Sequence, residues 1–190
     1  MGNNAMNVST GKPNIAGAVF CAPMGTAVPE DATSELDSAF RCLGYVSDEG
    51  LESENEMDVS AIKAWGGAIV YRSLTELDDN FALALIESEN VDVLKSVYGD
   101  KNVTEIEVED APGETHTETK IEVIAEDPQE RVWVFDLALR GSKRKRIVIP
   151  DGAITSREAI IYNDEDPIAY GITVSAYPNA AGSTHKEYIA

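Results

Sequence analysis

The pattern of apolar and polar residues predicts a mainly β chain, and its sharpest change lies in residues 81–104. Residues 81–86 form a short apolar run, the right length for a strand buried on both faces and too short for a helix. Polar residues follow and end this run. A second apolar pattern with a different period then begins at Val91.

This second pattern predicts a helix of about two turns at about residues 90–98. Val91, Leu94 and Val97 recur at helical spacing, with Tyr98 beside them. Asn90 is suited to cap the N-terminus, and Gly99 stands where a left-handed residue commonly ends a helix. Because so short a helix is unstable alone in water, we expect it to pack on a sheet.

Strand patterns occupy most of the remaining chain and predict a β-sandwich or barrel of about nine or ten strands with this one flanking helix. Two segments, residues 104–109 and 117–125, alternate with period two on either side of Pro112 and Gly113, which predicts a hairpin with a wet, mostly acidic face formed by Glu105, Glu107 and Glu109. The other expected strands lie at residues 17–22, 40–47, 68–72, 130–139, 141–150, 153–162 and 168–177.

The length of 190 residues fits a single domain, 1–190, and 43% apolar residues are enough for a core. Three segments lack a strong pattern: residues 1–14, expected to form a mobile arm, residues 48–67, and a polar tail at 178–190. Residues 48–60 are strongly acidic and offer little to bury, so we expect them to be mobile in isolation. Segment 48–67 therefore reads as a long loop or hairpin, which inside a compact domain is usually functional or disordered.

Charge narrows the possible partners. The chain has 34 acidic and 15 basic residues, a formal charge of −19. This balance disfavours stable binding to nucleic acid or to anionic membrane, although acidity for solubility alone stays an alternative. One basic block, Lys143, Arg144, Lys145 and Arg146, could contact phosphate or serve as a nuclear address. We favour instead the acidic surface of another copy as its partner, a head-to-tail contact that builds rings or filaments.

The sequence offers no evident chemistry, and we expect no enzyme, no cofactor and no metal. His116 and His185 lack partners at metal-ligand spacing, and Cys21 and Cys42 form no CxxC motif. No phosphate-binding loop or nucleophile elbow is present. No apolar run approaches the roughly 20 residues of a membrane span, and the start of the chain resembles no signal peptide.

At the level of whole stretches, the chain resembles the major tail protein, the tail tube subunit, of long-tailed bacteriophages of the siphophage type. The resemblance covers most of the chain and rests on the order of its elements and on composition. The stretches that carry it are APMGTAVPEDA (22–32), LGYVSDEGLE (43–52), AWGGAIVYR (64–72), FALALIESENVDVLKSVYG (81–99) and ITVSAYPNAAGSTHKEY (172–188).

The resemblance implies a structural virion protein, made in the host cytoplasm, whose hexameric rings stack into a hollow tube that conducts DNA. It implies further partners: the tape measure protein in the lumen, the tail tip and the tail terminator. It also implies that segment 48–67 orders against a neighbouring ring. Expected contact residues are Glu52, Glu54, Glu56, Met57, Ile62, Trp65, Lys143, Arg144, Lys145 and Arg146; candidate lumen residues are Glu105, Glu107 and Glu109.

Two alternatives remain: another ring-forming virion protein, such as a tail terminator or connector, and a non-enzymatic β-sandwich binding module.

A contact between the basic block and the acidic surface of another copy leads to a testable prediction. Charge reversal across residues 143–146 should impair assembly while the subunit stays folded.

Overall fold

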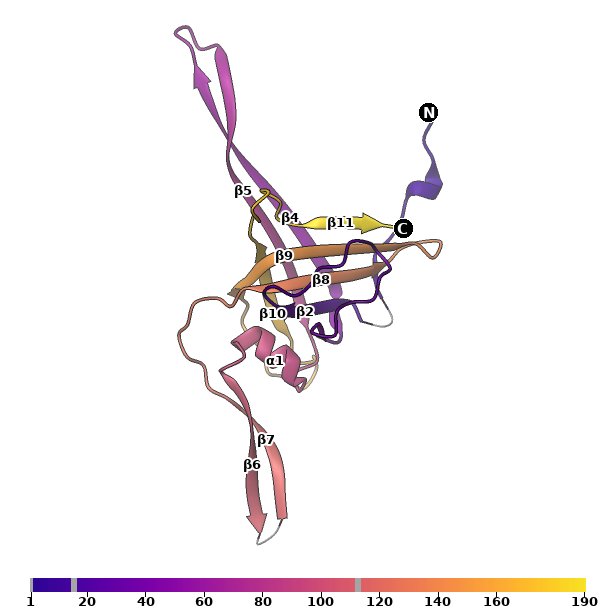
Figure 1. Ribbon diagram of the computed structural model, residues 1–190, viewed down its shortest axis with the longest axis vertical. Helices are drawn as coiled ribbons and strands as arrows, with labels where there is room; N and C mark the ends of the chain where they lie inside the picture. The colour runs from indigo at the N-terminus through magenta and orange to yellow at the C-terminus, as the bar shows by residue number, and fades with distance from the viewer. Residues whose placement is uncertain (1, 15–16, 112–113) are drawn as a thin grey trace.

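The part of the chain that the computed structural model describes, residues 2–14, 17–111 and 114–190, is mainly β, as predicted (Figure 1). It contains eleven strands, one α-helix and one short 3-10 helix at Ala5–Asn7. The elements are β1 Lys12–Pro13, β2 Val19–Pro23, β3 Arg41–Cys42, β4 Val46–Lys63, β5 Ile69–Leu85, α1 Val91–Tyr98, β6 Val103–Ala111, β7 Glu114–Ile121, β8 Arg131–Ala138, β9 Arg144–Arg157, β10 Tyr170–Ala176 and β11 Lys186–Ile189.

Nine strands form one sheet that folds over on itself into a β-sandwich-like body. Its main order is β3-β2-β8-β9-β10-β5-β4, with β1 paired to β8 and β11 paired to β9. Strand β9 belongs to both halves, because its first part pairs with β8 and its last part with β10. β6 and β7 make a separate two-stranded sheet.

The passage of β9 between the two halves favours a glycine at position 152. Trp133 Nε1 donates a hydrogen bond to the Gly152 carbonyl oxygen at 3.1 Å. A Cβ atom at Gly152 would lie 3.0 Å from Ile149 Cγ2 and 3.1 Å from the Ser175 carbonyl oxygen. The backbone of β10 therefore approaches β9 so closely that a side chain here would crowd it.

The core lies between the two halves and is closed by the helix. Phe81 of β5 stacks on Phe135 of β8 with ring centroids 5.6 Å apart. Val93, Leu94 and Val97 of α1 are buried against the same cluster. The predicted caps of the helix are confirmed: Asn90 accepts a hydrogen bond from the Asp92 backbone N–H, and Gly99 has φ +100°.

Several expected strands have different limits. Residues 81–85 are the inner end of β5, and their alternating burial places only one face in the core, not two. The expected strand at 40–47 breaks after β3, because Gly44 turns with φ +70° and the Glu87 carboxylate fills the place of a Cβ there. The strands expected at 141–150 and 153–162 are one strand, β9, in which Pro150 falls at an irregularity of the β8 pairing.

Segment 48–67 is not a loop for most of its length. Residues up to Lys63 continue β4 and pair with β5, and only residues 64–68 form the turn. At the chain ends, β1 and β11 are short strands that the sequence pattern did not predict. The expected strand at 117–125 ends at Ile121, and the Pro112–Gly113 turn lies outside the described residues.

Two hairpins project from the body toward opposite ends of the long axis (Figure 1). One is the outer part of β4 and β5, which we call the arm and define as residues 52–78. The other is β6–β7, attached near the helix. In the described part of the chain, no helix is long and apolar enough to span a bilayer.

Candidate assembly surfaces

The arm exposes both faces of its two-stranded ribbon to solvent. All its residues are exposed except the half-buried Ser73. A two-stranded ribbon is marginally stable in water without a covering layer. The arm is therefore a surface that still needs a partner.

Cross-strand pairing gives the arm an acidic face near the body. Glu52, Glu54 and Glu56 share this face, because they alternate along β4. Directly across the ribbon, Glu56 pairs with Asp78, and Asp58 with Glu76. Like charges directly opposite one another destabilise a ribbon, so this part of the arm gains from a cationic partner.

The outer half of the arm is apolar and uncovered. Met57 lies opposite Leu77 on the face that the acidic pairs do not occupy. Beyond a register shift, Val59 lies opposite Leu74, and Ile62 opposite Tyr71. The side chains of Met57 and Ile62 are 64% and 58% exposed. An apolar surface of this extent is typical of a protein–protein contact.

Trp65 stands alone at the end of the arm. It lies in the tight turn closed by hydrogen bonds between Ala64 and Ala68 and from the Gly67 N–H to the Ala64 carbonyl oxygen. Gly66 and Gly67 both have positive φ, which such a turn requires. The Trp65 side chain is fully exposed. A free indole at the end of a projecting hairpin is an expected anchor for an interface.

The basic block does not form one surface. Lys143, in the β8–β9 connection, and Arg144, the first residue of β9, are exposed, whereas Lys145 pairs with Glu187 of β11 at 2.7 Å. Arg146 is buried, and its guanidinium makes two hydrogen bonds to the Asp136 carboxylate, at 2.6 and 2.8 Å.

Arg146 also fixes the loop before β3, because its Nη1 donates to the carbonyl oxygens of Asp31 and Ser34. Only Lys143 and Arg144 of the block therefore present free charge at the surface of the folded chain.

The β6–β7 hairpin has two chemically different faces. Glu105, Glu107 and Glu109 lie on one face, as the alternation predicts, each opposite a threonine of β7. On the other face the His116 ring lies between carboxylates, with Nδ1 2.8 Å from Asp110 and Nε2 3.0 Å from Glu118.

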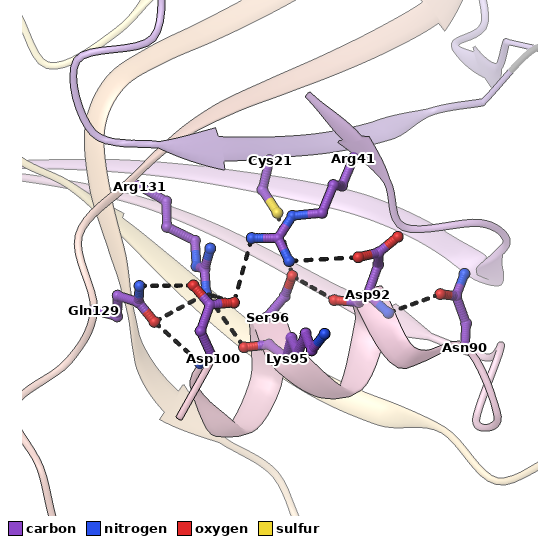
Figure 2. A network of polar contacts seen from close by, with 9 residues as sticks. All are labelled: Cys21, Arg41, Asn90, Asp92, Lys95, Ser96, Asp100, Gln129 and Arg131. Atoms are coloured by element: carbon purple, nitrogen blue, oxygen red, sulfur yellow. Dashed lines mark hydrogen bonds and ion pairs between the residues drawn. The ribbon is translucent and has the colours of Figure 1, made fainter. Parts of the chain in front are cut away.

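A polar network anchors the helix to the sheet (Figure 2). Asp100 follows the helix and lies 3.0 Å from Arg131 and 3.3 Å from Arg41. Burial opposes ionisation of Asp100, but hydrogen bonds from Arg131 and Gln129 and the charges of both arginines outweigh it and lower the pKa of this carboxyl. Burial raises the pKa of the Cys21 thiol in the same network, which makes this thiol unreactive.

The network offers no metal site. Among the described residues, no group of three or more His, Cys, Asp or Glu side chains is placed to hold a metal ion. The surfaces open to a partner are instead the arm, the exposed basic residues and the β6–β7 hairpin.

A β-sandwich with two projecting hairpins, one of them apolar and uncovered in its outer half, is typical of a structural protein. The chain belongs to the phage tail tube protein family, because the family model described as "Phage tail tube protein" matches residues 1–190, the whole chain. The resemblance seen in the sequence is thereby confirmed. Members of this family are structural components of the virion tail. A comparison with curated proteins gives no match.

From the sequence alone, residues of the arm could be proposed as contact residues, but their arrangement in space could not be predicted. It located the acidic and apolar residues of β4, but their cross-strand partners on β5 follow only from the register. The Arg146–Asp136 pair was also missed. A signal exists for Asp136, because it is a charged residue within an apolar strand segment, and such residues are rarely buried unless paired.

Proposed function

We propose that this chain is the repeating subunit of a siphophage-type tail tube, in which hexameric rings stack into a hollow conduit for DNA. The subunit acts through assembly alone and without enzymatic chemistry. The number six and the stacking follow from the resemblance to long-tailed phages. The observation that carries the proposal is the arm, whose apolar outer half has no covering layer from the part of the chain that the structure describes.

In the tube, the arm packs against neighbouring subunits and gains there the layer that the free chain lacks. Met57, Ile62 and Trp65 supply apolar contact, and Glu52, Glu54 and Glu56 supply an acidic face that cations of another copy can neutralise. Lys143 and Arg144 are the exposed cations of the basic block for such contacts. Ordering of the arm on contact would keep free subunits from polymerising early.

The net negative charge of the chain is suited to the wall of a tube through which DNA passes. A negative wall repels the phosphate backbone, so DNA slides through without binding. We propose Glu105, Glu107 and Glu109 as lumen residues, because they form a continuous exposed acidic row on β6. The tape measure protein would fill this lumen before DNA passes, and the tail tip and terminator would close the two ends.

Electron microscopy of the purified protein, from dilute to concentrated, tests the proposal. Long hollow tubes with sixfold end views are expected. Single rings that never stack would favour a terminator or connector, and monomers at every concentration would favour a binding module. Either of these two results would overturn the proposed function.

A further inference from the structure

The arm is polarised in charge from its root to its turn. Segments 48–58 and 76–78, the base of the arm with the residues of β4 that lead into it, hold eight carboxylates and no basic side chain. Segment 59–75, the outer end, holds two charged residues, Lys63 and Arg72, and both are basic. The outer end of the arm is therefore complementary in charge to its base. Because the two lie at opposite ends of one ribbon, they can meet only between two copies of the chain.

The root of the arm also contains an apolar hollow of about 560 Å³. It opens where β4 is irregular: Val46 pairs with Leu85 and Leu51 with Leu83, so five steps of β4 lie against two of β5. The extra residues, 47–50, stand away from the ladder and form one wall. Its apolar lining comes from Val19, Val46, Leu51, Phe135 and Leu137.

One polar atom in this lining lacks a partner. Ser47 Oγ is buried and has no hydrogen-bond partner among the described residues. A buried polar group left unpaired costs stability, and such a group in a native fold calls for an explanation. Ser47 Oγ is closed to solvent in the free chain, so this side chain must turn toward the hollow before it accepts a hydrogen bond from an entering indole N–H, a bond that a purely apolar side chain cannot donate.

We infer that the turn of one arm docks into the hollow at the root of the arm of a second copy, with Trp65 as the inserted side chain. This inference deepens the proposed function and rests on it. The indole fills the apolar hollow and donates its N–H to Ser47 Oγ of the second copy, whose side chain turns toward the hollow to accept it. Lys63 and Arg72 then face Asp48 and Glu49 on the rim, where Lys12 is the opposing cation.

The contact is heterologous, because the turn and the hollow are different surfaces of the same chain. Each docked copy still offers a free turn at one end and a free hollow at the other. Contacts of this kind continue without limit unless a rotation closes them. They fit the growth of a tube better than they fit a closed dimer.

Fluorescence provides a direct test, because the two tryptophans of the chain differ completely in exposure. Trp65 is fully exposed, and Trp133 is fully buried. On assembly of the wild-type protein we expect a blue shift of the emission and the loss of acrylamide quenching. Tubes in which Trp65 remains as quenchable as in free subunits would overturn the docking.

Substitutions of Trp65 distinguish the contribution of the apolar ring from that of the indole N–H. Trp65→Ala should raise the concentration needed for assembly at least about tenfold, as for a buried aromatic anchor. Trp65→Phe keeps the apolar body without the N–H and should fall between Trp65→Ala and the wild type. Tyr162→Ala, at an exposed aromatic residue far from the arm in sequence, is the matched control and should assemble normally.

A charge exchange tests the orientation. Lys63→Glu with Arg72→Glu should weaken assembly, and so should Asp48→Lys with Glu49→Lys, whereas the four changes together should restore it. Normal tubes from Trp65→Ala, or no restoration by the fourfold variant, would overturn the tip-to-root contact and leave the tube function standing. A wild-type protein that never assembles would overturn the proposed function itself.

Discussion

At the scale of single residues, Arg146 and its neighbours in the basic block have separate roles. Because Arg146 and Asp136 are both buried, Arg146→Ala leaves an uncompensated carboxylate and should lower the free energy of unfolding by about 3–5 kcal/mol. The exposed pair Lys143→Ala with Arg144→Ala is the control and should change it by less than about 0.5 kcal/mol. Urea unfolding of both proteins measures the difference.

This contrast also changes how the basic block must be tested in assembly. Charge reversal across all four residues would unfold the body through Arg146, so a loss of tubes would say nothing about contacts. Lys143→Glu with Arg144→Glu avoids that problem. An equal loss of stability in the two alanine variants would show that Arg146 has no special role in the fold.

The lowered pKa of Asp100 makes the stability of the folded chain depend on pH. Its pKa in the folded chain is lowered, so its contribution is present above the unfolded value, near 3.8, and is lost as the pH falls through the folded value. Asp100→Asn should therefore have a lower Tm than wild type at neutral pH, and the two should converge below about pH 4. Asp127→Asn, at an exposed carboxylate, is the control. A constant difference in Tm from pH 7 to pH 3 would contradict this account.

At the scale of elements, the arm should be separable from the body. Replacing residues 56–78 by Asn-Gly would join the strands through a short turn and keep the paired residues Asn55 and Asp79. The removed residues are exposed apart from the half-buried Ser73, so the body should still unfold cooperatively. It should not assemble, because the covering contacts are gone. Circular dichroism and electron microscopy measure the two outcomes, and a shortened protein that still forms tubes would exclude the arm from assembly.

The elements also show what the sequence can predict. Helix α1 was predicted to within its caps, because Asn90, Gly99 and the spacing of Leu94 and Val97 are local signals. Segment 48–67 was expected as a loop or hairpin, because its acidic residues offer little apolar surface to bury, and the structure shows a hairpin in which β4 extends to Lys63. The backbone hydrogen bonds of β4 come from β5, through a register that no local pattern encodes.

The candidate assembly surfaces also include parts that the sequence could predict and parts that it could not. Trp65 could be named from the sequence because it stands beside Gly66 and Gly67, and Met57 because it is a large apolar residue in an acidic segment. The hollow could not, because its walls come from β1, β2, β4 and β8, which are distant in the chain. The terminal strand β11 was missed for another reason: four residues are too few to establish a period.

At the scale of the whole molecule, the acidic row on β6 makes a prediction about DNA. Glu105→Lys, Glu107→Lys and Glu109→Lys together replace three exposed negative charges by positive ones. If this row lines the lumen, tubes of the variant should retain DNA at low salt and release it as salt rises, whereas wild-type tubes should retain none. Thr115→Lys, Thr117→Lys and Thr119→Lys, on the same face, should act in the same direction. DNA retention unchanged in both variants would place this face outside the lumen.

The length of the arm has a further consequence for tip-to-root docking. Lys63 lies twelve residues beyond Leu51 along β4, which at about 3.3 Å per residue spans about 40 Å. Since the turn of each arm would dock at the hollow of the next copy, the length of the arm would set the distance between successive copies in the assembly. Removing two residues from each strand should then shorten the spacing along the arm by about 7 Å while the copies still join.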